Sequence, residues 1–112
     1  MPTRRIIVDL SDRKLYLLEG KSVIRGFSVG IGQVVSRTPQ GEFLVVNKVP
    51  NPGGPFGAYW LGLSKRHYGI HGTNNPSSIG KMVSKGCIRM HNRDVVELAS
   101  LISLGTHVTI RP

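Results

Sequence analysis

Two residues in the segment 70–90, IHGTNNPSSIGKMVSKGCIRM, have the chemistry of a nucleophile and its base. They are His71 and Cys87, the latter being the only cysteine of the chain. A lone cysteine has no partner for an internal disulfide, so its sulfur either packs in the core or takes part in a reaction. Cysteine attacks as the thiolate, and a histidine within hydrogen-bond reach can take the thiol proton. This pairing indicates a Cys87–His71 nucleophilic site.

The neighbours of the cysteine carry fixed positive charge. Lys85, Cys87 and Arg89 alternate along the chain, so an extended conformation would point all three to one face. Cations beside a thiol favour its ionised form. We therefore expect the pKa of Cys87 to lie well below the value of about 8.5 that a free thiol has.

Two other interpretations of these residues are open. A free cysteine is among the most buried residue types, so Cys87 could be a structural core residue. Its proximity in sequence to His67, His71 and His91 could also suggest a metal site. However, the sequence has no CxxC or HExxH pattern and no second close pair of ligands beside the cysteine. We therefore expect neither a metal nor another cofactor.

Two motifs of the chain resemble those of a known family. The first is made of His71, Gly72 and Thr73, followed by Ser84, Gly86, Cys87, Ile88 and Arg89. The second, Thr-Pro-x-Gly-x-Phe, spans residues 38–43. Both are similar to the signatures of the YkuD-type L,D-transpeptidase catalytic domain, and the resemblance extends from about Arg4 to Ile110. Many members carry a second histidine where this chain has Lys85, a difference that concerns the substrate rather than the mechanism.

The resemblance implies peptide-bond exchange in peptidoglycan. Cys87 would attack the carbonyl between meso-diaminopimelate and D-alanine in a tetrapeptide stem, so that D-alanine leaves and a thioester remains. The side-chain amine of a second stem would then attack the thioester and form a 3→3 crosslink. Water in place of that amine would complete a carboxypeptidase reaction. A carbapenem would add covalently to Cys87, because the family forms acyl-enzymes through cysteine.

The resemblance also implies roles for individual residues. His71 would deprotonate Cys87, with its ring oriented by a backbone carbonyl, for which Gly86 is the candidate. Backbone N–H groups around Gly86 and Cys87 would stabilise the oxyanion. Arg89 would contact a substrate carboxylate in a bidentate manner. The other substrate-binding candidates are Ser84, Gly72, Thr73, Tyr59 and Trp60, of which the two aromatic residues could equally pack in the core.

Two other functions are compatible with the sequence. An L,D-carboxypeptidase or another hydrolytic cysteine peptidase could use the same pair of Cys87 and His71. A wall-binding module without catalysis is the second alternative, with Cys87 in the core. Formation of crosslinked dimers from two stems would exclude the first, and a thiol that resists alkylation in the folded state would favour the second.

Length and composition fit a single globular domain over residues 1–112. The chain is 39% hydrophobic, and no segment approaches the roughly 18 apolar residues of a membrane-spanning helix. Its start, MPTRRIIVDL, has too short an apolar run for a signal peptide. The resemblance nevertheless implies a location in the bacterial cell wall or on the extracytoplasmic side. We expect a monomer.

The chain is strongly basic, with 15 Lys and Arg against 6 Asp and Glu and a formal charge of +9. These basic residues are scattered, and neither a recognition helix nor an aromatic stacking motif is evident, so we expect no nucleic-acid partner. An anionic polymer of the bacterial wall would account for the charge. A basic surface without a specific partner accounts for it as well. The partner that the resemblance implies is the peptidoglycan stem peptide of the meso-diaminopimelate type.

The residue pattern predicts many short strands and one helix. Strands are predicted over 4–10, 14–19, 22–29, 43–49, 59–64, 68–71 and 107–111, with loops at 30–41 and 51–57. In the third strand, Val23, Phe27 and Val29 are expected to share a face. The helix is predicted over 93–103, with Asn92 as N-cap and a buried stripe of Val95, Leu98, Ala99 and Ile102. These elements predict a mostly-β, sandwich-like domain with one short helix near the C-terminus.

Overall fold

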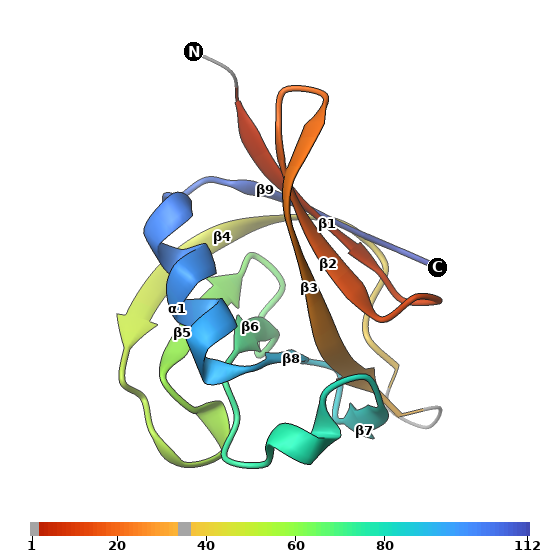
Figure 1. Cartoon of the computed structure of the whole chain (residues 1–112), viewed down its shortest axis with the longest axis vertical. Helices are drawn as coiled ribbons and strands as arrows, with labels where there is room; N and C mark the ends of the chain where they lie inside the picture. Colours follow the sequence, from red (N-terminus) through yellow and green to blue (C-terminus); the bar gives the residue numbers. More distant parts are fainter. Residues whose placement is uncertain (1–2, 34–36) are drawn as a thin grey trace.

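The computed structural model describes residues 3–33 and 37–112. Its strands are β1 (Arg4–Asp9), β2 (Lys14–Glu19), β3 (Ser22–Gly32), β4 (Gly41–Pro50), β5 (Tyr59–Leu63), β6 (Gly69–His71), β7 (Met82–Ser84), β8 (Ile88–Met90) and β9 (His107–Arg111). One α-helix, α1 (Asn92–Leu101), and two 3-10 turns, η2 (Gly54–Phe56) and η3 (Pro76–Ser78), complete the described elements. The mostly-β fold with one helix near the C-terminus is confirmed (Figure 1).

The strands form one sheet that closes on itself. Their order is β2-β1-β9-β4-β5-β6-β8-β3-β7, and β2 also pairs with β3. This last pairing closes the strands from β2 to β3 into a ring, so that the sheet is barrel-like and β7 extends it beyond β3. The long strand β3 makes the closure possible, because residues 22–28 pair with β2 while residues 29–32 pair with β8 and β7. Closure leaves fewer exposed strand edges than an open sheet would.

One hydrophobic core joins the strands to helix α1. Alternate residues of the strands are buried, as in β1, where Ile6 and Val8 are fully inaccessible to solvent. Helix α1 lies across one side of the sheet (Figure 1) and packs against β5 and β6. The predicted apolar stripe is buried in the core, with Val95, Leu98 and Ala99 in the helix. Ile102 is buried too but follows the helix as its C-cap, because α1 ends at Leu101 and not at residue 103 as predicted.

One predicted strand face is wrong, and a β-bulge explains it. Phe27 and Val29 are buried as expected, whereas Val23 is 59% exposed. In the pairing of β2 with β3, Leu17 lies opposite Arg25 and Leu18 lies opposite Val23, so Ile24 is an extra residue in β3. An extra residue reverses which side chains face the core beyond it. Ile24 accordingly packs against the core in place of Val23.

The remaining differences from prediction are in the loops and at the helix start. Strands β7 and β8 and turn η3 were not predicted. The helix begins at Asn92 with His91 as its N-cap, so the prediction of Asn92 as the N-cap is wrong. The predicted loop 30–41 begins later than expected, because β3 continues through Gly32. Part of that loop, residues 34–36, lies outside the described residues.

The described residues contain no helix that is both long and apolar enough to cross a membrane.

Candidate active site

Three adjacent strands bring three of the predicted site residues side by side. In the register of β5 with β6, Trp60 lies opposite His71, and in that of β6 with β8, His71 lies opposite Arg89. Side chains alternate between the faces of a strand, so the neighbours of these residues point the other way. Leu61, Ile70 and Ile88 are accordingly buried in the core. The strands therefore present Trp60, His71 and Arg89 on the face opposite the core.

Glycine on this face leaves room for a large aromatic ring. A Cβ atom on Gly69 would lie 2.6 Å from the Trp60 ring, so only glycine lets the indole lie against the strand at this position. The indole stacks on His71, with ring centroids 5.5 Å apart and planes inclined by 18°. Phe56, from turn η2, meets the imidazole edge-to-face at 5.2 Å. Phe56 also meets the Trp60 ring edge-to-face at 5.3 Å, so the three rings pack against one another as a cluster, and His71 is only 4% exposed.

The imidazole of His71 has one nitrogen committed to the backbone. Its Nδ1 lies 2.5 Å from the carbonyl oxygen of Gly72. A carbonyl can only accept, so Nδ1 carries the hydrogen and Nε2 is left with a lone pair that can receive a proton. Burial lowers the pKa of His71, an effect that the Gly72 hydrogen bond opposes and the charge of Arg89 reinforces. His71 is therefore neutral at pH 7, in the state that a general base requires.

The carbonyl that orients His71 is not the predicted one. Gly86 was the candidate, and the structure has Gly72 in this position. The Gly86 N–H is also engaged, because it donates to Ser84 Oγ at 3.1 Å. Of the two predicted oxyanion donors, the N–H of Cys87 therefore remains the candidate. Gly86 instead shapes the turn, with a positive φ of 120° and a position against the ring of Tyr68.

Ser84 ties together the turn that precedes the cysteine. Its hydroxyl donates to the carbonyl of Cys87 at 2.7 Å and accepts from the N–H of Gly86. Ser84 is buried, 2% exposed, and these two bonds account for its hydroxyl. Such local side-chain bonds favour a turn over a continuous strand. The segment 84–87 thus has a fixed shape, set by Ser84 and by the positive φ of Gly86.

Cys87 is half-buried, and its environment differs from the prediction. Burial raises the pKa of the Cys87 thiol above its usual value, although a backbone hydrogen bond from Gly69 and the charge of Arg89 oppose the rise. The prediction of a lowered pKa is therefore wrong. The predicted alternation fails because the chain turns at Lys85 and Gly86, and Lys85 is exposed and absent from the charges that act on the thiol.

Arg89 acts electrostatically on both Cys87 and His71. The charge of Arg89 lowers the pKa of both Cys87 and His71, so it is close to both. The thiol donates to the carbonyl of His67, with Sγ 3.7 Å from the carbonyl oxygen. No hydrogen bond joins the thiol to the imidazole of His71 in the described residues.

Arg89 has an unused donor. Its Nε is buried, and no described residue accepts a hydrogen bond from it. A buried donor without a partner is uncommon in folded proteins and is often explained by a ligand. Its place beside the thiol makes Arg89 suitable for an anionic group of a substrate. The sequence around Arg89 also favours an anionic ligand, because no Asp or Glu occurs between Glu42 and Asp94.

The other predicted substrate-binding residues have structural contacts. Tyr59 alternates with Trp60 and packs against the core. Thr73 is buried, its hydroxyl accepts from the N–H of Asn75 at 2.9 Å, and its backbone bonds to the side chain of Asn92. Contacts of Gly72, Thr73 and Ser84 with a substrate stay predictions. Sequence reasoning missed Phe56 and assigned Asn92 only to helix capping.

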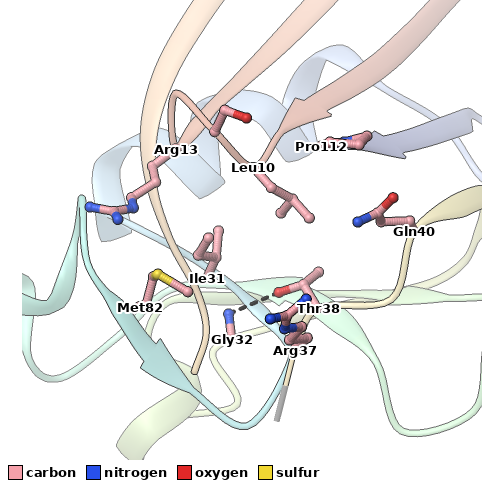
Figure 2. A pocket seen from close by; sticks show the side chains of 10 residues that line it. Leu10, Arg13, Ile31, Gly32, Arg37, Thr38, Gln40, Met82 and Pro112 are labelled. Atoms are coloured by element: carbon pink, nitrogen blue, oxygen red, sulfur yellow. Dashed lines mark hydrogen bonds between the residues drawn. The ribbon is translucent and has the colours of Figure 1, made fainter. Parts of the chain in front are cut away.

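A cavity is lined in part by Arg37, whose carbonyl oxygen lies 3.5 Å from the position of a Cβ on Gly86. It has a volume of about 280 Å³, and its lining includes Leu10, Ile31, Thr38 and Met82 (Figure 2). Thr38 is the first residue of the second sequence motif, and its hydroxyl accepts from the N–H of Gly32 at 2.8 Å. This motif therefore fixes the end of β3, which pairs with β8 and β7 of the active site. Three or more His, Cys, Asp or Glu side chains do not converge as a metal site anywhere in residues 3–33 and 37–112.

Sequence comparison identifies the family. The family model of the YkuD L,D-transpeptidase catalytic domain matches residues 3–110. The chain therefore belongs to this family, and the resemblance inferred from its two motifs is confirmed.

Two Bacillus proteins called YkuD, whose names place them among the L,D-transpeptidases, are close relatives. The protein from Bacillus licheniformis is 62% identical over 108 residues, which are 96% of this chain and 66% of that protein. The protein from Bacillus subtilis is 58% identical over 105 residues, which are 94% of this chain and 64% of that protein. The chain thus spans about two thirds of the length of these relatives.

Solved structures have the same fold. An L,D-transpeptidase from Mycobacterium smegmatis superimposes with a TM-score of 0.88 at 17% identity, over 99% of this chain and 59% of that one. The Ldtfm enzyme, solved as its avibactam carbamoyl enzyme, superimposes with a TM-score of 0.86 at 25% identity, over 100% of this chain and 50% of that one. At 17% identity, the likeness to the Mycobacterium smegmatis enzyme shows only that the fold is shared.

The raised pKa of Cys87 predicts a particular pH dependence of alkylation. Only the thiolate reacts quickly, so the rate of modification by iodoacetamide should rise with pH through the pKa of the thiol. We expect the midpoint in the folded protein to lie above that of the same cysteine in the urea-unfolded chain. Mass spectrometry of samples quenched at different times measures both rates. A midpoint lower in the folded than in the unfolded protein would show that folding does not raise the pKa of Cys87.

Proposed function

We propose that this chain is an L,D-transpeptidase that crosslinks peptidoglycan stems through a thioester on Cys87, with His71 as the base. The observation that carries the proposal is the hydrogen bond between His71 Nδ1 and the Gly72 carbonyl. It leaves Nε2 as a proton acceptor, and the charge of Arg89 acts on both His71 and Cys87. Membership of the YkuD family supports the reaction class.

Arg89 binds the donor stem in this proposal. Its buried Nε has no acceptor among the described residues, and a stem peptide offers carboxylates. A planar guanidinium can hold a carboxylate by two hydrogen bonds, which fixes direction as well as distance. The carboxylate would also neutralise the charge that lowers the pKa of His71. Substrate binding would thereby make His71 a stronger base at the moment it is needed.

Proton transfer follows binding. The thiol and the imidazole are both neutral in the free protein, because burial raises the pKa of Cys87 and lowers that of His71. The thiol turns from the His67 carbonyl to Nε2 of His71 and gives up its proton as sulfur attacks the scissile carbonyl. His71 then returns this proton to the amine of the departing D-alanine. The N–H of Cys87 donates to the developing oxyanion.

The second half of the reaction repeats these roles. The side-chain amine of an acceptor stem gives a proton to Nε2 of His71 and attacks the thioester carbonyl. The carbon–sulfur bond breaks, the new amide forms the 3→3 crosslink, and the proton returns to Cys87. Trp60 and Phe56 enclose the imidazole, which limits the access of water to the base. We propose that the reaction takes place on the wall side of the membrane.

Incubation with purified tetrapeptide muropeptides tests the proposal. We expect crosslinked dimers, detected by mass spectrometry together with released D-alanine, and none of either from the Cys87→Ala variant. A carbapenem should add one acyl group to the intact mass of the protein but not to that of Cys87→Ala; the avibactam carbamoyl enzyme of the Ldtfm structure supports this expectation. Tripeptide products without dimers would instead identify an L,D-carboxypeptidase. A folded protein that formed neither product would refute both.

A further inference from the structure

We propose that Asn92 is the positioning residue of the histidine base, acting through the single peptide group that joins Gly72 to Thr73. The proposal deepens the proposed function, since it assigns the group that keeps His71 competent to accept the thiol proton. The hydrogen bonds on which the proposal rests are present without a substrate.

The side chain of Asn92 connects two loops of the active site. Its Oδ1 accepts from the N–H of Thr73 at 3.1 Å and from the N–H of Ala58 at 3.0 Å. Its Nδ2 donates to the carbonyl of Thr73 at 3.1 Å. Oδ1 thus uses both of its lone pairs, and the amide holds Thr73 by both of its backbone groups. Thr73 is 2% exposed, so water offers little alternative to these bonds.

The peptide group between Gly72 and Thr73 transmits this constraint to the base. A peptide is planar, and in the trans form its C=O and N–H point in opposite directions. The C=O of this peptide belongs to Gly72 and accepts from Nδ1 of His71. The N–H belongs to Thr73 and donates to Oδ1 of Asn92. Fixing the N–H on Asn92 therefore aims the carbonyl at Nδ1, which places the ring hydrogen there and keeps Nε2 free.

The surrounding backbone is shaped to receive the amide of Asn92. A Cβ atom on Gly72 or on Gly57 would collide with Oδ1 of Asn92. Gly57 also has a positive φ of 65°, which turns the chain so that the N–H of Ala58 reaches Oδ1. Two glycines thus allow backbone segments from different loops to approach one side-chain oxygen.

Helix capping does not explain this side chain. The N-cap of α1 is His91, and no side chain caps the helix there. Asn92 is the first residue of the helix, and its amide is directed to the two loops and not to the helix N–H groups. Helix α1 packs against β5 and β6, the strands that carry Trp60 and His71. The helix therefore provides a rigid support for an amide that reaches the active site.

The tautomer of His71 is the direct readout. In ¹⁵N-labelled protein without substrate, long-range ¹H–¹⁵N spectra distinguish a protonated Nδ1 from a protonated Nε2. We expect the Nδ1–H form in the wild-type protein and a mixture, or the Nε2–H form, in Asn92→Ala. In Asn92→Asp, which keeps an oxygen acceptor for the Thr73 N–H, we expect the Nδ1–H form to persist.

Kinetics and a matched control complete the experiment. Because a base in the wrong tautomer cannot act, kcat on muropeptides should fall by about 10- to 100-fold in Asn92→Ala, with KM changed by less than about threefold. Thr106→Val is the control for stability, since it removes a buried hydroxyl that makes two hydrogen bonds before β9. It should lower the melting temperature and leave both the tautomer and kcat unchanged.

Several results would overturn the proposal. An Asn92→Ala protein that melts earlier but keeps the wild-type tautomer and kcat would show that Asn92 only stabilises the fold. If Asn92→Ala does not fold, Asn92→Asp decides, and a change to the Nε2–H form in that variant refutes the role assigned to Oδ1. The spectra need no substrate, so a wild-type protein that forms no product would refute the proposed function without affecting the tautomer result.

Discussion

Removing either Cys87 or His71 should abolish crosslinking, and removing both should cost little more. Without the thiol there is no thioester, and without Nε2 of His71 the buried thiol keeps its proton because its pKa is raised. Residues that act as one catalytic unit are strongly non-additive. We therefore expect Cys87→Ala, His71→Ala and the double variant each to lose at least about 1,000-fold in turnover of a tetrapeptide muropeptide.

Loss of stability must be separated from loss of chemistry in this comparison. His71 packs against both Trp60 and Phe56, so alanine would leave a cavity. His71→Phe keeps an aromatic ring packed against both and removes both nitrogens, and it should melt closer to the wild type while remaining inactive. His67→Ala is the matched histidine control, because His67 is exposed and contacts the thiol through its carbonyl. Substantial activity in His71→Phe together with inactivity in His67→Ala would move the base to His67.

The family and the fold class could be predicted because each depends on residue type and local pattern, and the same patterns make Cys87 and His71 the candidate nucleophile and base. Cys87 is the only cysteine, and two motifs in the right order identify the family. The apolar stripe of the helix follows from a period of 3.6 residues, which packing did not alter. The barrel closure could not be predicted in the same way, since it depends on the pairing of β2 with β3 across a bulge that no residue type signals.

The electrostatics of the site required the structure. The positive charges near Cys87 in sequence suggested a lowered pKa, but the sign of the shift depends on burial, which opposes them and prevails. Lys85 illustrates the error, since the turn at Gly86 removes it from the face of the thiol. Asn92 could be recognised as a residue that accepts backbone N–H groups, which is why it was predicted to cap the helix. Which N–H groups it meets depends on loops distant in sequence, at Ala58 and Thr73.

Gly86→Ala, in the turn before Cys87, should lower both stability and crosslinking activity. Gly86 has a φ of 120°, where a residue with a Cβ is strained by about 1–3 kcal/mol. The new Cβ would also lie 2.5 Å from Cε1 of Tyr68, a distance that requires the ring or the turn to move. Because Cys87 follows directly, movement of the turn displaces the thiol. We expect a melting temperature lower by several degrees and crosslinking reduced by at least about 100-fold, since small misplacements of reacting groups are costly.

Gly80→Ala is the control that separates backbone strain from the contact with Tyr68. Gly80 also has a positive φ, of 85°, but no atom lies within 4 Å of the position of a Cβ. This variant should therefore lose stability through strain alone and retain most of its activity. Replacing Tyr68 by leucine in the Gly86→Ala protein should recover part of the lost activity, because it removes the ring atom that the Cβ meets. Equal losses of activity in Gly86→Ala and Gly80→Ala, with no recovery on Tyr68→Leu, would show that the shape of this turn does not position the nucleophile.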